Sequence, residues 1–105
     1  TFIGQLMGLI KYTLNHRKGT ISYPALAAAT AQSESIIRSA LFWMIFQGEI
    51  SITHETGNEI TLVKGTSTKD PILASRYWDE VRSMLAEAMA YRSHFIHADK
   101  NSLIP

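Results

Sequence analysis

Apolar side chains and one threonine recur every three or four positions at the start of the chain. They are Phe2, Leu6, Leu9, Ile10, Thr13 and Leu14. This spacing places them on one face of an amphipathic helix. The basic residues that follow suit the negative pole of a helix dipole, and Gly19 can adopt the left-handed conformation of a C-cap. We therefore predict a helix over residues 2–16.

Two serines mark the starts of two further helices. Ser22 precedes an alanine-rich stretch at residues 23–30 with Pro24 near its start, and Ser33 precedes residues 34–47. A serine hydroxyl accepts a hydrogen bond from a backbone N–H in the first turn, where a proline is also tolerated. Only residues 31 and 32 separate the two stretches, so we predict two helices joined by a tight turn.

Alternation of apolar and polar residues replaces the helical spacing at residues 49–53 and 59–63. Two alternating runs this close together, joined by residues that include Gly57, predict a β-hairpin. Residues 20–22 contain two β-branched side chains, which favour a short strand.

A long amphipathic helix is predicted after the polar linker at residues 64–69. Asp70 and Pro71 are typical of a helix start, and the helix runs from there to about residue 91, or at the furthest to residue 96. One arc of this helix carries its apolar residues, which are Leu73, Ala74, Tyr77, Trp78, Val81, Met84, Leu85, Ala88 and Met89. The opposite arc is polar, so we expect the apolar arc to be covered.

These elements predict a mostly α fold with a small β-hairpin. Helix, short strand, helix, turn, helix and hairpin is the order of a winged helix-turn-helix, in which the hairpin is the wing. We assign residues 1–65 to this unit. Residues 66–105 then form a linker and an added long C-terminal helix that packs on the same domain.

Composition narrows the functional classes. The chain has 105 residues, which is the length of one domain. Its hydrophobic fraction of 46% and charged fraction of 18% exclude a mainly disordered chain. It has no cysteine, which excludes a disulfide framework and agrees with a reducing compartment, so we expect a cytoplasmic location. The longest apolar run, residues 40–46, is too short to cross a membrane. A net charge of +1 is low for a free-standing nucleic-acid binder.

The outward face of the third helix is unusual for a DNA-reading element. It carries Ser35, Arg38, Ser39, Phe42 and Phe46, with Trp43 at its edge. A helix that reads the major groove needs several Arg, Lys, Asn or Gln side chains, and this face offers one basic residue. The rings can be core beneath the long helix, a docking surface for a partner, or a stacking surface for single-stranded nucleic acid. We predict that Phe42, Trp43 and Phe46 form a docking surface.

The densest basic cluster is His16, Arg17 and Lys18. It is either a solvated helix end or a phosphate contact, which Lys11, Lys64 and Lys69 would reinforce if the fold brings them close. Together with Arg38, these three residues are our candidates for nucleic-acid contact.

Catalytic and metal-binding motifs give no positive signal. The sequence contains neither a nucleophile elbow nor a phosphate-binding loop of the G-x-x-x-x-G-K-[ST] type. His94, His97 and Asp99 have a spacing that can bind a metal, but two histidines and one carboxylate fit a polar helix end better. We predict no catalytic residue, no metal ligand and no cofactor within this segment, and whether the chain belongs to an enzyme stays open.

A resemblance to a known family is carried by LMGLIKY at 6–12, ALFW at 40–43, GEI at 48–50, LAEAMAYRSHF at 85–95, AD at 98–99 and LI at 103–104. These segments are similar to the C-terminal accessory region of bacterial RecJ-type single-stranded-DNA-specific exonucleases. The order of elements is similar over nearly the whole chain. The resemblance implies a parent enzyme of DNA recombination and repair that degrades single-stranded DNA from the 5′ end with Mn²⁺ or Mg²⁺. The D-H-H triplet of its catalytic core is absent here, so no catalytic residue carries over.

Three hypotheses follow. The chain is a non-catalytic winged-helix module of a longer RecJ-like exonuclease, which docks on the rest of its parent chain or another protein, or makes weak, sequence-tolerant contact with DNA. Alternatively, it is a free-standing winged-helix transcription regulator that forms a homodimer through its long helix. A third hypothesis is a pure assembly module that binds no DNA.

Overall fold

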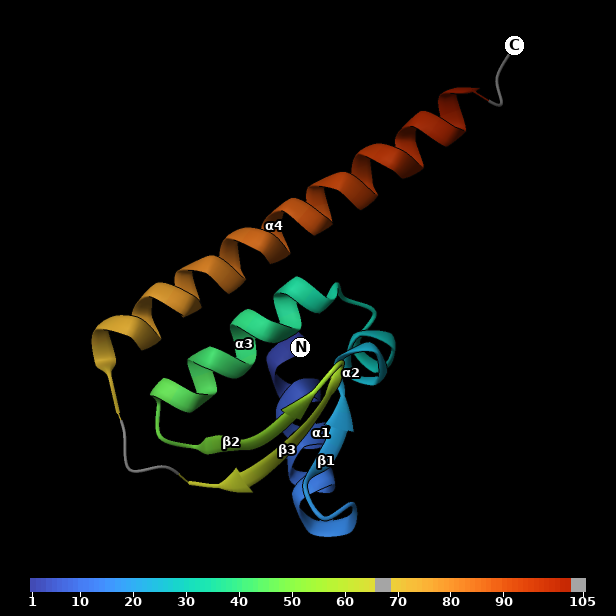
Figure 1. The fold of residues 1–105 in the computed structure, drawn as a ribbon. Helices are drawn as coiled ribbons and strands as arrows, with labels where there is room; N and C mark the ends of the chain where they lie inside the picture. Colours follow the sequence, from blue (N-terminus) through green and yellow to red (C-terminus); the bar gives the residue numbers. More distant parts are fainter. Residues whose placement is uncertain (66–68, 103–105) are drawn as a thin grey trace.

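The computed structural model of the chain describes residues 1–65 and 69–102, with side chains as far as Tyr91. Its elements follow in the order α1 (Phe2–His16), β1 (Thr20–Ser22), α2 (Tyr23–Thr30), α3 (Glu34–Phe46), β2 (Ile50–Thr56), β3 (Glu59–Lys64) and α4 (Pro71–Ser102) (Figure 1). The prediction of a mostly α fold with a small antiparallel β element is confirmed.

Capping side chains start the helices where the sequence predicts. The hydroxyls of Ser22 and Ser33 accept hydrogen bonds from the N–H groups of Ala25 and Ile36, at 3.2 and 3.3 Å. The carboxylate of Asp70 accepts one from the N–H of Leu73 at 3.0 Å. Each bond satisfies a backbone donor that has no partner within its own helix. The C-terminal end of α4 is less well predicted, because the helix continues to Ser102.

The β element is larger than the predicted hairpin. The hairpin is present, but β1 pairs antiparallel with β3 on its other side, which gives a three-stranded sheet in the order β1-β3-β2. The first arm of the hairpin is also longer than the predicted residues 49–53. β2 reaches Thr56, with an irregularity of register between Ile52 and His54. A bulge of this kind shifts the alternation on which the predicted boundary at residue 53 depends.

Gly19 connects α1 to this sheet. Its φ is +79°, and a Cβ at this position would clash with the carbonyl oxygen of Leu62. In return, the carbonyl of Gly19 accepts a 2.7 Å hydrogen bond from the N–H of Leu62. Only glycine allows this close approach without strain. The end of α1, with its basic residues, is thereby held against β3.

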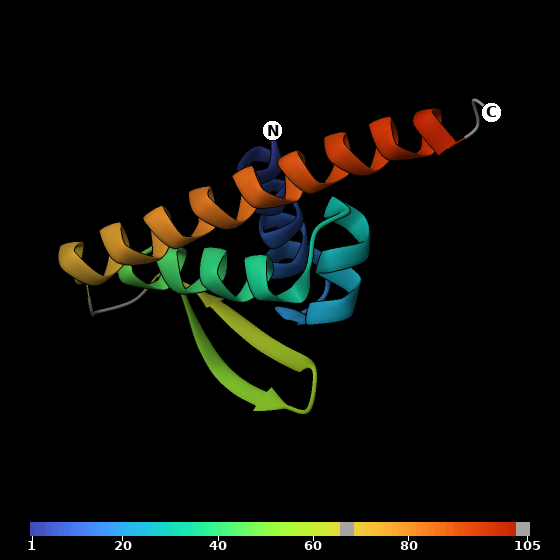
Figure 2. The same cartoon turned by 90° about the horizontal axis from the view of Figure 1, so that it is seen from above.

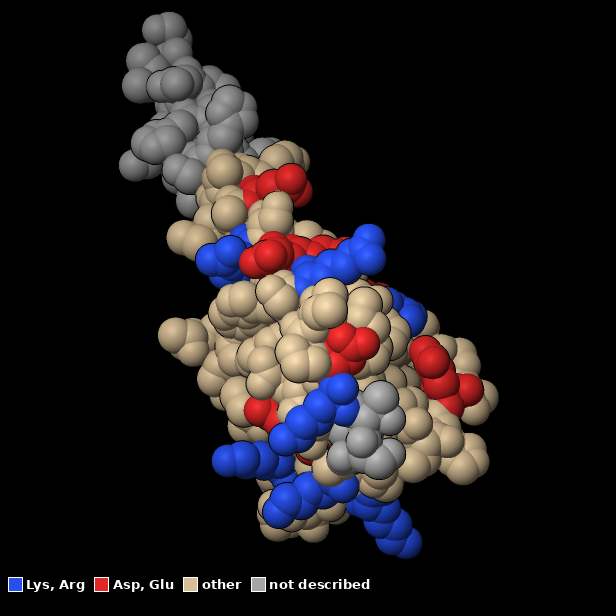
Figure 3. Space-filling view, turned by 90° about the vertical axis from the view of Figure 1, so that its left-hand side faces the viewer, with Lys and Arg blue, Asp and Glu red and all other residues tan. Residues whose placement is uncertain are grey.

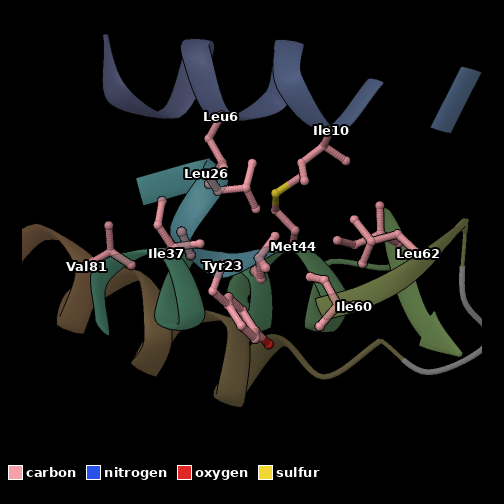
Figure 4. Close-up of a cluster of buried hydrophobic side chains, with 12 residues drawn as sticks. Leu6, Ile10, Tyr23, Leu26, Ile37, Met44, Ile60, Leu62 and Val81 are labelled. Atoms are coloured by element: carbon pink, nitrogen blue, oxygen red, sulfur yellow. The ribbon is translucent and has the colours of Figure 1, made fainter. Parts of the chain in front are cut away.

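The core lies between α1, α2, α3 and the sheet (Figure 4). Leu6, Leu26, Ile37 and Ile60 are fully buried at its centre. Such aliphatic side chains come from four different elements, and their burial is the main force that holds the small domain together.

α4 lies along α3 on the side away from α1 and then continues past it (Figures 1 and 2). Val81, in the part of α4 that faces α3, is fully buried, whereas Met89 is 71% exposed. The prediction that Met89 shares a covered arc is therefore wrong, because α4 is longer than the helix it packs against. Over the described residues, no helix has the combination of length and hydropathy that a membrane span requires.

Candidate functional site

Five aromatic rings join the outward face of α3 to α4. Tyr77 stacks on Phe42 and Phe46, with ring centroids 5.3 and 5.7 Å apart. Beside them, Trp43 and Trp78 have centroids 4.7 Å apart. These distances are those of favourable aromatic pairs. We refer to Phe42, Trp43, Phe46, Tyr77 and Trp78 as the aromatic strip.

The aromatic strip occupies the surface that the sequence predicts for docking. Trp43 and Phe46 are half-buried against α4, and Phe42 keeps 38% of its surface exposed. Ser39, which the sequence places on the same outward face, is only 7% exposed. The prediction that Ser39 faces solvent is therefore wrong, because α4 packs on this side of α3. Docking of a partner on the remaining exposed part of Phe42 stays a prediction.

Arg38, the one basic residue of α3, has two partners within the chain. Its guanidinium lies 3.9 Å from the centre of the Tyr23 ring and 3.6 Å from Oε1 of Glu55. The hydroxyl of Tyr23 donates a long, 3.5 Å hydrogen bond to the same carboxylate oxygen. The three side chains tie α2, α3 and β2 together. A phosphate that bound Arg38 would therefore compete with Glu55 for the guanidinium.

Tyr23 is the buried member of this group. Burial raises the pKa of its hydroxyl above 10.0, and the negative charge of Glu55 raises it further, while Arg38 acts in the opposite direction. Tyr23 therefore remains a protonated hydrogen-bond donor at neutral pH. The group is a structural link between elements, with half-exposed charges at its edge.

The other residues predicted to contact nucleic acid lie together at the C-terminal end of α1. His16, Arg17 and Lys18 are exposed there, and the ring of His16 lies 4.6 Å from that of Tyr12. Figure 3 shows that Lys and Arg side chains collect at this end of the body, away from the projecting end of α4. The structure thus separates Arg38, with its two partners, from the cluster at residues 16–18.

An open groove of about 850 Å³ lies beside this basic end. Its wall and floor come from α1, the end of α3 and the adjoining parts of β2 and β3. The apolar lining residues are Met7, Ile10, Leu14, Met44, Ile50, Leu62 and Val63. Lys11, Lys18 and Lys64 also line it, so two of the lysines expected to reinforce the cluster do lie beside Lys18. We refer to this feature as the lysine groove.

Lys69 lies next to the lysine groove without lining it. Its side chain covers Gly48, whose φ is +82° and which itself borders the groove. Lys69 instead lines a smaller hollow of about 400 Å³ with Trp43, Phe46 and Trp78. Lys69 therefore lies apart from Lys11, Lys18 and Lys64, which line the lysine groove.

The described side chains offer no metal centre. Among them, no three His, Asp or Glu residues lie close enough to hold an ion. They do not fit the Mn²⁺ or Mg²⁺ of the resembled enzymes, and we derive no metal-dependent step from them. The side chains of His94, His97 and Asp99 lie outside the described part of the chain.

Sequence reasoning missed the partners of Arg38. Glu55 is 17 positions further along the chain and Tyr23 is 15 positions earlier, and no periodic signal links such residues. A carboxylate in the hairpin opposite a lone arginine is the one available hint. The apolar floor of the lysine groove was missed for the same reason, since its residues come from four elements.

Comparisons with protein-family models, with curated proteins and with solved structures find no match to this chain.

Proposed function

We propose that the chain is a non-catalytic winged-helix module of a RecJ-like single-stranded-DNA 5′–3′ exonuclease, acting in docking and in weak, sequence-tolerant contact with DNA. The sequence resemblance gives the parent enzyme. The element order, with a hairpin after the third helix and a first strand that completes the sheet, supports the winged-helix assignment.

The observation that carries the proposal is the covering of α3 by α4. In a winged helix, the third helix usually enters the major groove. Here Phe46 and Trp43 of that helix pack on Tyr77 and Trp78 of the same chain. With this face occupied, α3 is a scaffold for α4, and reading of duplex sequence is not its role.

DNA contact then falls to the basic end of the body. Arg17 and Lys18 are exposed there and have no ion-pair partner among the described residues. Two or three cations neutralise few phosphates, so the contact is weak and strongly dependent on salt. It is also insensitive to base sequence, because phosphate contacts carry no sequence information.

The alternative is a transcription regulator that forms a homodimer through α4. One observation favours it, because Met89 and Tyr91 expose apolar surface on the part of α4 beyond α3. Another disfavours it, because Tyr77, Trp78 and Val81 of the expected seam already pack within the chain.

Fluorescence anisotropy with a labelled thymidine oligonucleotide, titrated over a range of salt concentrations, tests the proposal. We expect measurable binding at low salt that the double substitution Arg17→Glu and Lys18→Glu weakens about tenfold or more. Arg76→Glu on α4 is the matched control, since it reverses an exposed charge away from the basic end. This control is expected to bind as the unchanged chain does.

Arg38→Ala separates the proposal from its alternative. The proposal predicts that this variant binds the oligonucleotide normally, because Arg38 is engaged with Glu55. Preferential binding to one duplex sequence, lost in Arg38→Ala while circular dichroism shows an intact fold, would overturn the proposal in favour of the transcription regulator.

A further inference from the structure

The lysine groove has a chemistry that neither the fold nor weak DNA contact requires. It is a hollow of about 850 Å³ open to solvent, in a chain of only 105 residues. Exposed apolar surface of this kind on a small domain marks a site of interaction. Val63, which borders it, is 41% exposed in a strand whose neighbours Leu62 and Ile60 are buried.

The floor of the groove favours aliphatic ligands over nucleobases. Met7, Leu14 and Val63 contribute the aliphatic side chains that remain accessible there, and none of the lining residues is aromatic. Binding of single-stranded DNA relies on flat rings on which bases stack. Methionine, by contrast, adapts its shape to varied apolar side chains and is frequent at peptide-binding surfaces.

The rim of the groove selects for negative charge. The charged lining residues are three lysines, Lys11, Lys18 and Lys64, and a single carboxylate, Glu49. None of the three lysines forms an ion pair with a described residue. Lys18 lies in the left-handed turn that ends α1, where its φ is +55°. An acidic ligand therefore meets a field of complementary sign.

The backbone of β3 adds a docking edge at the same place. Gly65 donates to Glu49 on the β2 side, whereas Leu62 donates to Gly19 on the β1 side. Backbone groups alternate sides along an antiparallel strand. The N–H and C=O of Lys64 therefore point to the β1 side, beyond the last pair of β1 and β3, Thr20 with Thr61. Because β3 ends at Lys64, this edge offers an extended peptide the backbone N–H and C=O of that one residue.

We propose that the lysine groove binds an extended, acidic peptide segment of a partner protein, with its apolar side chains on the aliphatic floor and its carboxylates against Lys11, Lys18 and Lys64. This inference deepens the docking role in the proposed function and rests on it, because it names the chemistry of the docked partner.

The test uses the 105-residue chain and a short fluorescein-labelled peptide that alternates leucine and aspartate. In an extended peptide, this alternation places the apolar side chains on one face and the acidic ones on the other. Titration followed by anisotropy is expected to give saturable binding that weakens as salt is added. A peptide that alternates leucine and lysine is the matched control, and it is expected to bind at least tenfold more weakly.

Two variants locate the peptide on the protein. Val63→Asp places a charge on the half-exposed floor, and the double change Lys11→Glu and Lys64→Glu reverses the rim. Each is expected to weaken peptide binding about tenfold or more, while Arg76→Glu leaves it unchanged. Circular dichroism checks the fold of each variant, and Lys11, Lys64 and Arg76 are all exposed charges whose replacement removes no core contact.

The outcomes separate this inference from the proposed function. Absence of acidic-peptide binding, or binding unaffected by Val63→Asp and by the rim variant, would overturn the peptide groove. If the thymidine oligonucleotide still binds in that case, the proposed function stands alone. If the oligonucleotide instead displaces the peptide and needs Val63, the groove is a nucleic-acid site and the peptide inference is wrong.

Discussion

The two faces of α3 are built from different side chains and are covered by different parts of the chain. The inner face presents Ile37, Ala40, Leu41 and Met44, each no more than 3% exposed. The outer face presents the rings of the aromatic strip, of which Phe42 remains 38% exposed. One face joins α3 to the body, and the other attaches α4.

This difference shows how a small domain carries an added helix. Aliphatic side chains fill the core without gaps, so the loss of a few methyl groups leaves a cavity. The rings of the strip pack with their planes inclined by 9–36° and tolerate partial exposure, so a few contacts hold α4 in place. The inner face should therefore determine folding, and the outer face should determine where α4 lies.

The largest expected effect is on the inner face. Ile37→Ala removes a fully buried side chain from the centre of the core, and we expect it to lower the free energy of unfolding by about 2–4 kcal/mol. Denaturant unfolding followed by circular dichroism measures this change. Ile72→Ala is the matched control, because Ile72 is 82% exposed on α4, and it should shift the same quantity by less than about 0.5 kcal/mol. Equal effects at the two sites would contradict the comparison.

A smaller effect is expected on the outer face. Tyr77→Ala removes the ring that stacks on both Phe42 and Phe46, and we expect a loss of about 1–3 kcal/mol in the same unfolding experiment. Tyr77→Phe keeps the ring and should differ from the unchanged chain by less than about 0.5 kcal/mol. A Phe variant as unstable as the Ala variant would show that the hydroxyl, and not the stacking, attaches α4.

The group of Tyr23, Arg38 and Glu55, which links α2, α3 and β2, predicts how the stability of the fold depends on pH. Because burial and Glu55 raise the pKa of Tyr23 in the folded chain, the folded state holds this proton more tightly than the unfolded state does. The stabilisation is fully present below the ordinary tyrosine pKa of 10.0, and it is lost as the pH rises from there through the pKa of the folded state.

The absorbance of tyrosinate tests whether the pKa of Tyr23 is raised in the folded chain. The chain has four tyrosines, and the difference from a Tyr23→Phe variant isolates the signal of Tyr23. We expect Tyr23 to ionise above its ordinary pKa, and Arg38→Ala to raise that pKa further because a nearby positive charge is lost. Ionisation of Tyr23 at its ordinary pKa would contradict the buried position of this ring.

The smallest effect is expected on the polar, solvent-facing arc of α4. Asp79 and Arg82 form an exposed ion pair at 3.0 Å, and Asp79→Ala should change the free energy of unfolding by only a few tenths of a kcal/mol. Thermal unfolding in low and high salt provides the measurement. A loss above about 1 kcal/mol would mean that this polar arc of α4 makes contacts that the isolated chain does not show.

Much of the fold was predictable because its signals are local. The bounds of α1 and α2 and the caps at Ser22, Ser33 and Asp70 follow from spacing and from side chains within three residues. The pairing of β1 with β3 was not predicted, because it joins residues about 40 positions apart, such as Thr20 and Thr61. A three-residue segment carries too little alternation to reveal a register.

The candidate site was predictable only in its parts. The sequence identifies the rings of α3 and the basic cluster, but it leaves open whether the long helix covers the rings. It also places Arg38 with residues 16–18, although the structure pairs Arg38 with Glu55 and brings Lys18 together with Lys11 and Lys64. Which charges meet depends on the tertiary arrangement of four elements, and helical periodicity contains no such information.

The central claim is that α4 packs on α3 through the aromatic strip of a single chain. A double-mutant cycle with Phe46→Ala and Tyr77→Ala tests it most directly, since the two rings are stacked 5.7 Å apart. The account predicts a coupling of about 0.5–1.5 kcal/mol that is the same at every protein concentration. A coupling near zero, or one that grows with concentration, would contradict it and show that the outer face of α3 is open or is covered by a second molecule.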